Sequence, residues 1–156
     1  EVVGEDVTKM VLKLYFDRDL WKRQPTECGV LETIEIGKGH EMTVKMDTGN
    51  NTSVCSLHAE DIEVKGKKVS WKTEGIKYTY PLKRYVTLLK PAEDRPVVEM
   101  EVKFLNTTYT QEVGLDKRNQ IPFLANRDFM RRANLMINPA RKFMLTNKRD
   151  EPAEDS

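Results

Sequence analysis

The 156-residue sequence has few residues that bind metals or form disulfides, and this scarcity excludes several kinds of site. Its 2 cysteines, Cys28 and Cys55, form no C-x-x-C pair, and its 2 histidines, His40 and His58, are equally scattered along the chain. A structural zinc site usually takes four Cys or His ligands in closely spaced pairs. We therefore expect no metal and no cofactor, with a mixed Cys/His site as the weaker alternative.

Motifs of two enzyme classes are missing as well. No G-x-x-x-x-G-K-[ST] loop is present to hold ATP phosphates, and His40-Glu41 lacks the second histidine of a zinc-peptidase helix. No apolar run approaches the ~20 residues of a membrane span, so we expect no membrane association. The 26 Lys and Arg residues balance 25 Asp and Glu residues, and a net charge of +1 argues against a nucleic-acid partner. No targeting signal is readable, so both a cytoplasmic and a periplasmic location are compatible with the sequence.

From about residue 30 onward, apolar residues recur at every second position, which is typical of half-buried β-strands. Turn residues, mostly Gly, Asn and Asp, separate these runs at the ~8–12-residue spacing of a β-sandwich or barrel. The alternating runs cover residues 34–36, 42–46, 62–64, 69–73, 76–82, 98–104 and 109–115. The sequence therefore predicts an all-β fold.

One short helix is expected near the C-terminus. Residues 127–134 contain good helix formers and no β-branched residue. Asn126 is the expected N-cap, and Asp128 would lie favourably in the first turn.

The two ends of the chain carry weaker signals. Residues 7–21 fit both an alternating strand and a helix, and we favour a strand that packs on the barrel or on a partner chain. Residues 147–156 are rich in charge, which predicts a disordered tail.

The sharpest chemical feature is the triplet Asp47-Thr48-Gly49 at the exit of a strand pattern. On its own, the triplet is more typical of a strand that ends in an Asx-type turn with a flexible glycine. An aspartic peptidase needs a carboxylate at a rigid loop tip, a hydroxyl residue that braces the loop, and a glycine where the substrate backbone comes close. Thr52 and Ser53 add hydroxyl groups just after the triplet, and this context favours the peptidase interpretation.

These residues resemble the retropepsin-like aspartic peptidases, which pair an Asp-Thr-Gly loop with an apolar-apolar-Gly-Arg element before a C-terminal helix. Residues 121–129, Ile-Pro-Phe-Leu-Ala-Asn-Arg-Asp-Phe, are similar to that second element. The match is closest to a bacterial branch labelled ATP-dependent zinc protease, whose genes are associated with glutamate ligases. Its pattern Asp-Thr-Gly-x-x-Thr-Ser-x-x-x-Leu-His-Ala-x-x-Ile is similar to residues 47–62, and two later blocks resemble residues 95–98 and 138–145.

The resemblance covers residues 30–146 and implies a retropepsin-like (acid protease) closed barrel with one short C-terminal helix. Residues 1–29 would then be an N-terminal extension that packs on the barrel or on a partner, and residues 147–156 the disordered tail. Neither an ATP site nor a zinc site is supported by the residues, despite the label of the branch. A metallopeptidase is accordingly the weakest interpretation.

The activity that the resemblance implies is that of an aspartic endopeptidase, a hydrolase in which two carboxylates share one proton and activate a water. This chain has one Asp-Thr-Gly, and neither Asp116 nor Asp128 lies in a comparable pattern. The catalytic pair would therefore come from Asp47 of two chains, which meet in an isologous homodimer.

The resemblance also implies supporting roles and a substrate. The Thr48 hydroxyl would brace the opposite loop, Gly49 and Thr52 would shape the loop, and Arg127 would act as a structural brace. The substrate would be a protein or peptide, and the gene association makes a glutamate-rich tail the specific candidate. A flap is expected between residues 62 and 97, either at the hairpin around Gly66 or on the longer excursion to Arg95.

Two positions depart from the family pattern. Asn50 follows the triplet where the family usually has Ala, and Asn126 precedes Arg127 where the family has Gly. These departures motivate an alternative from another class, a non-catalytic binding or accessory module with the acid-protease fold that acts with a glutamate-ligase system. The association state distinguishes the two hypotheses, because a strict monomer cannot assemble the pair of carboxylates.

Overall fold

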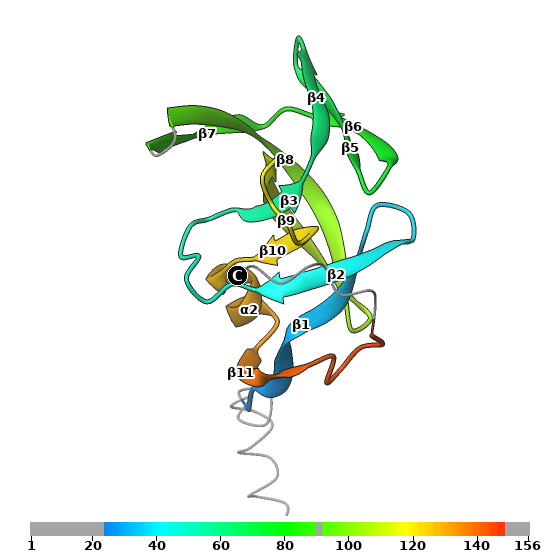
Figure 1. Ribbon diagram of the computed structural model, residues 1–156, viewed down its shortest axis with the longest axis vertical. Coiled ribbons are helices and arrows are strands. Elements are labelled where there is room, and N and C mark those ends of the chain that lie inside the picture. The colour runs from blue at the N-terminus through cyan, green and yellow to red at the C-terminus, as the bar shows by residue number, and fades with distance from the viewer. Residues whose placement is uncertain (1–23, 90–91, 149–156) are drawn as a thin grey trace, which may run out of the picture.

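The structure is a computed structural model that describes residues 24–89 and 92–148 (Figure 1). The predicted strand over residues 7–21 lies outside the described residues, as do residues 149–156 of the predicted tail.

Strands make up most of the described chain, which confirms the predicted all-β class with one short helix. The elements in chain order are β1 (Thr26–Ile36), β2 (His40–Met46), β3 (Cys55–His58), β4 (Glu60–Lys65), β5 (Lys68–Thr73), β6 (Ile76–Pro81), β7 (Arg84–Leu89), β8 (Ala92–Phe104), β9 (Thr107–Asp116), β10 (Phe123–Ala125), α2 (Arg127–Arg132) and β11 (Leu135–Lys142). The alternating runs predicted from the sequence all fall within these strands or at their ends.

Eight strands form one sheet in the order β11-β1-β2-β10-β3-β9-β8-β7. An additional pairing joins β1 to β8, with Glu35 opposite Lys103 and Ile36 opposite Val102. This pairing closes β1, β2, β10, β3, β9 and β8 into a ring, and it leaves β11 and β7 as the two outer strands. The side chains that alternate toward the inside of the ring form the core, which includes Ile34, Met42, Val44, Leu57, Met100, Val102, Leu115 and Phe123.

A second sheet, in the order β4-β5-β6, stands at the opposite end of the molecule from β11 (Figure 1). Within this sheet the rings of Trp71 and Tyr78 stack, with their centroids 5.6 Å apart. The Tyr78 ring also stacks on His40 of the ring strand β2, with centroids 5.9 Å apart. The Tyr78 hydroxyl also forms a hydrogen bond with His40 of β2, with 2.5 Å between the hydroxyl oxygen and Nδ1 of His40. The Tyr78 ring covers Gly37, where a Cβ would lie 3.0 Å from the ring, and Gly37 has a φ of 57°. A side chain at Gly37 would therefore disturb both the turn and the aromatic packing.

The predicted helix is confirmed as α2, although it ends earlier than residue 134. Asn126 is the N-cap, and its side-chain oxygen accepts from the backbone N–H of Phe129 at 2.9 Å. The helix buries Phe129 and Met130 and ends before Asn134, whose positive φ of 54° is incompatible with a continued helix.

Strands β3, β7, β10 and β11 lie outside the predicted alternating runs, and β1 is longer than its run. Strand β1 begins at Thr26, so residues 26–29, assigned to the N-terminal extension from the sequence, are part of the sheet. These residues pair in parallel with β11. Strand β11 was not recognised in the sequence because it contains Pro139, and proline within sheets is found mainly in edge strands. Strand β7 was missed because apolar residues occur on both of its faces.

A buried carboxylate joins the start of the sheet to the segment after β11. Glu32 is 0% exposed. It accepts from the backbone N–H groups of Gly29 (2.7 Å), Met144 (3.0 Å), Leu145 (3.1 Å) and Thr146 (3.1 Å), and from the Thr146 hydroxyl (2.7 Å). Such a dense set of donors compensates for the loss of water around a buried charge.

Candidate active site

Asp47 follows β2 directly, and neighbouring strands fix its backbone. Strands β2 and β10 run in parallel, with Ala125 opposite Met46. The backbone N–H of Asp47 donates to the carbonyl of Ala125 at 3.0 Å, which continues the ladder by one residue. The two backbone segments that begin at Asp47 and at Asn126 therefore leave the sheet next to each other.

A tight turn follows and holds the carboxylate. The backbone N–H of Asn50 donates to the Asp47 carbonyl at 3.0 Å. The N–H of Gly49 donates to the Asp47 carboxylate at 3.2 Å. A Cβ at Gly49 would lie 3.4 Å from that carboxylate oxygen, so glycine leaves the carboxylate open to an approaching chain. Thr48 and Gly49, at the tip of this turn, are both exposed.

Asn50, the residue that departs from the family pattern, builds the loop and does not crowd Asp47. Its side-chain oxygen accepts from the backbone N–H of Thr52 at 3.0 Å and from the Thr52 hydroxyl at 2.6 Å. Its amide donates to the carbonyl of Val54 at 3.1 Å. Both ends of the Asn50 side chain are thus engaged within residues 50–54, and Thr52 takes part in this closure.

The N-terminus of α2 anchors the same loop. The side-chain amide of Asn126 donates to the carbonyl of Thr52 at 2.9 Å while its oxygen caps the helix. The backbone N–H of Arg127 donates to the carbonyl of Asn50 at 2.9 Å, and its Nε donates to the carbonyl of Thr48. The structure therefore brings Asp47, Thr48, Gly49, Thr52 and Arg127 together in one loop junction.

A buried thiol lies beneath this junction. Cys55 Sγ lies 3.4 Å from the Asn126 side-chain oxygen. Burial raises the pKa of the Cys55 thiol to about 12, so it is protonated at neutral pH. A protonated, fully buried sulfur is neither a nucleophile nor a metal ligand.

Asp47 opens into a polar cavity of ≈ 320 Å³. The lining residues are Lys45, Asp47, Arg118, Asn119, Gln120, Ile121 and Leu124. Two of them, Lys45 and Arg118, are cations, and Asp47 is the one carboxylate of this lining.

A closed ring of charged groups holds Arg118 at this cavity. Arg118 donates through Nη2 to Glu93 at 2.7 Å and through its backbone N–H to Asp116 at 2.8 Å. Arg95 completes the ring, with Nε 2.7 Å from Glu93 and Nη1 3.1 Å from Asp116. The hydrogen bond from Arg95 is the main reason that the pKa of Glu93 lies below its ordinary value. The sequence analysis missed Arg118 and Glu93, since surface charges carry no pattern that predicts such a ring.

Strand β7, which pairs with β8 in a hairpin, lies near the loop that follows β2 (Figure 1). A mainly apolar cavity of ≈ 180 Å³ separates the two. Its walls are Asn50, Thr52, Val54, Cys55 and Ser56 from the loop and β3, Val86 and Leu88 from β7, Arg95 from β8, and Gly114 from β9. Strand β7 thus presents Val86 and Leu88 to the loop that carries Asp47.

Among the residues that the structure describes, no three His, Cys, Asp or Glu side chains are grouped as metal ligands. Over the same part of the chain, no helix combines the length and apolar character needed to cross a membrane.

Comparison with known proteins identifies a similar fold without a known activity. The chain is similar to the crystal structure of protein Lpg0085 from Legionella pneumophila subsp. pneumophila str. Philadelphia 1, a protein with unknown function (DUF785). The two are 26% identical with a TM-score of 0.61, and the match covers 76% of this chain and 97% of Lpg0085. No family model and no curated protein matches this chain.

Proposed function

We propose that this protein is an aspartic endopeptidase of the retropepsin type, with a closed barrel and an active site at a homodimer interface. The observation that carries the proposal is the fixed position of Asp47 between β10 and α2. Its backbone continues the β2–β10 ladder, and the residues after it hydrogen-bond to Asn126 and Arg127. A catalytic carboxylate needs such rigid support, because small displacements of a reacting group cost large factors in rate.

The chemistry requires a second carboxylate from the partner chain. Two Asp47 side chains close together across a two-fold axis would share one proton, because like charges at short range do not both ionise. The ionised Asp47 would take a proton from a bound water as that water attacks the peptide carbonyl. The protonated Asp47 would donate to the carbonyl oxygen and stabilise the tetrahedral intermediate. Exposed Thr48 hydroxyls beside each carboxylate could then brace the opposite loop.

The β7–β8 hairpin is the proposed flap, in preference to the hairpin around Gly66. Val86 and Leu88 of β7 face the cavity beside the Asp47 loop. Gly66 joins β4 to β5 in the separate three-stranded sheet. A peptide held between the hairpin and the loop would be shielded from water on one side, as catalysis in a low-dielectric site requires.

The proposed substrate is a protein or peptide with acidic residues, and a glutamate-rich tail is the specific candidate. Lys45 and Arg118 line the cavity that contains Asp47. The hydrogen bond from Nη2 of Arg118 to Glu93 already orients the guanidinium, which lowers the cost of ordering it around a substrate carboxylate.

Cleavage of paired peptides tests the proposal. The purified chain is incubated with a peptide that ends in several glutamates and with a matched peptide that ends in glutamines, and products are identified by mass spectrometry. We expect cleavage of the glutamate peptide by the wild type and none by Asp47→Asn, which keeps the shape of the side chain. Undiminished cleavage by Asp47→Asn contradicts the proposal. A chain that stays monomeric at high concentration and cleaves neither peptide supports the alternative, an accessory module that binds without turnover.

A further inference from the structure

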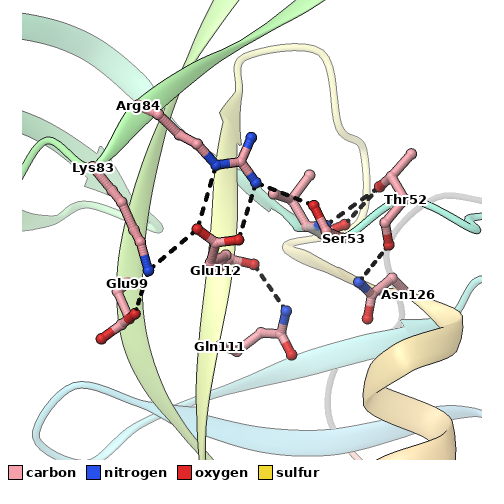
Figure 2. A network of polar contacts seen from close by, with 9 residues as sticks. Thr52, Ser53, Lys83, Arg84, Glu99, Gln111, Glu112 and Asn126 are labelled. Carbon is pink, nitrogen blue, oxygen red and sulfur yellow. Dashed lines mark hydrogen bonds and ion pairs between the residues drawn. The ribbon is translucent and has the colours of Figure 1, made fainter.

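The Asp47 loop is hydrogen-bonded to the N-terminus of α2, and it is also hydrogen-bonded to Arg84 of β7. Arg84 Nη2 donates to the Ser53 hydroxyl at 3.1 Å, and Ser53 lies in the loop between Asp47 and β3. Figure 2 shows the Arg84 guanidinium between Ser53 on one side and Glu112 on the other, with Thr52 and Asn126 on the far side of the loop. The loop is therefore attached to two separate elements, the helix and the hairpin.

Glu112 of β9 fixes the orientation of this guanidinium. Its Oε1 accepts from Arg84 Nη2 at 3.0 Å, and its Oε2 accepts from Arg84 Nε at 3.4 Å. The hydrogen bond from Arg84 is the largest cause that holds the pKa of Glu112 below its ordinary range. Two contacts to one carboxylate fix the plane of a guanidinium, which leaves the Nη2 group directed at Ser53.

The neighbouring lysine contacts the same carboxylate but not the loop. Lys83 Nζ lies 2.7 Å from Glu99 and 3.4 Å from Glu112. In Figure 2 it approaches Glu112 from the side opposite Ser53. Lys83 thus provides a natural control, a cation in the same cluster without the hydrogen bond to the loop.

We propose that Arg84 is a positioning residue that couples the β7–β8 hairpin to the loop carrying Asp47. Arg84 is the first residue of β7 and pairs with Val97 of β8, so its hydrogen bond to Ser53 attaches the base of the hairpin to the loop. The Ser53 side of the loop is thus held to the hairpin, whereas Asn126 holds the Thr52 side to the helix. The consequence for catalysis rests on the proposed function, because hairpin and Asp47 must then close on the same peptide.

Hydrogen exchange of the full-length chain tests the coupling without any substrate. The variants are Arg84→Gln, Ser53→Ala, the double variant, and Lys83→Gln as the control. We expect each of the first two to raise exchange of the amides in residues 48–55 about tenfold, the effect of losing one hydrogen bond to a charged group. The double variant should exchange no faster than either single variant, and Lys83→Gln should match the wild type. Unchanged exchange in Arg84→Gln, or equal acceleration in Lys83→Gln, overturns the proposal.

Kinetics on the peptide that the wild type cleaves provide the second readout. A displaced loop should lower kcat of Arg84→Gln about tenfold to a hundredfold while KM changes less. Arg84→Lys keeps the positive charge but lacks the planar guanidinium that contacts two groups at once, so it should recover only part of the lost kcat. A kcat equal to that of Lys83→Gln overturns the positioning role. If the wild type cleaves no peptide, the proposed function fails, and hydrogen exchange alone decides the coupling.

Discussion

The side-chain amide of Asn126 donates to the carbonyl of Thr52 at 2.9 Å, across a separation of 74 residues. The same side chain caps α2 through its oxygen, so one residue joins the helix to the Asp47 loop. A glycine at this position would provide neither contact. The departure from the family pattern therefore strengthens the loop support.

Replacing Asn126 by alanine should lower the free energy of unfolding by about 2 kcal/mol, because both the helix cap and the loop contact are lost. Urea denaturation measures the change. Asp128→Asn, which removes a first-turn charge and leaves the cap intact, is the control and should cost less. Equal losses in the two variants would contradict the dual role of Asn126.

Glu32 should be the most sensitive charged position outside the candidate site. Glu32→Ala leaves several partly buried N–H groups without an acceptor, so we expect a loss on the order of 3 kcal/mol in the free energy of unfolding. Glu32→Gln should lose less, because the amide oxygen still accepts. Glu35→Gln, on the same strand, should be close to wild type in denaturant titrations. A Glu32→Ala variant as stable as Glu35→Gln would show that the segment after β11 contributes little.

Both thiols should be unreactive in the folded protein. Cys28 and Cys55 are 0% exposed, and burial raises the pKa of each thiol to about 12. Since the thiolate is the nucleophile, iodoacetamide should modify neither cysteine at neutral pH in the native state. Both should react after unfolding in guanidinium chloride, and mass spectrometry gives the stoichiometry. Rapid native labelling of Cys55 would mean that the loop above it opens readily.

The contribution of Glu112 to stability should depend on pH. The hydrogen bond from Arg84 is the main cause that lowers the pKa of Glu112 in the folded state. A lowered carboxyl pKa adds stability that is complete above the unfolded pKa, about 4.3, and is lost as the pH falls through the folded value.

The difference in Tm between the wild type and Glu112→Gln should therefore be largest near neutral pH and shrink under acid. Differential scanning fluorimetry over a pH series measures this difference. Glu101→Gln, which replaces an exposed carboxylate of β8, is the control for the loss of one surface charge. A pH-independent difference for Glu112→Gln would mean that the ion pair with Arg84 adds no stability.

Much of the fold could be predicted because alternation of apolar residues reports which face of a strand is buried. The ring strands β2, β8 and β9 follow that rule, and so does the short helix with its N-cap Asn126. Alternation fails for Glu32, a charged residue inside the protein. The backbone N–H groups of residues 144–146 that donate to it lie 112–114 positions away in the sequence, so no local pattern predicts them.

The candidate site could be predicted in part for a similar reason. The Asp-Thr-Gly triplet is local, so Asp47 and its turn were visible in the sequence. Arg84 and Arg118 were not, since each is directed to the loop or the cavity by carboxylates on other strands. Long-range pairs of this kind become evident only when the strands that carry them are placed side by side.

The central claim is that two copies of Asp47 form one active site, and mixing the wild type with Asp47→Asn tests it most directly. The two chains are unfolded together, refolded at constant total concentration, and assayed on the cleaved glutamate peptide. If one carboxylate from each chain is required, only dimers of two wild-type chains are active. Activity then falls with the square of the wild-type fraction. Activity that falls in direct proportion to the wild-type fraction would show that each chain acts alone and would contradict the account.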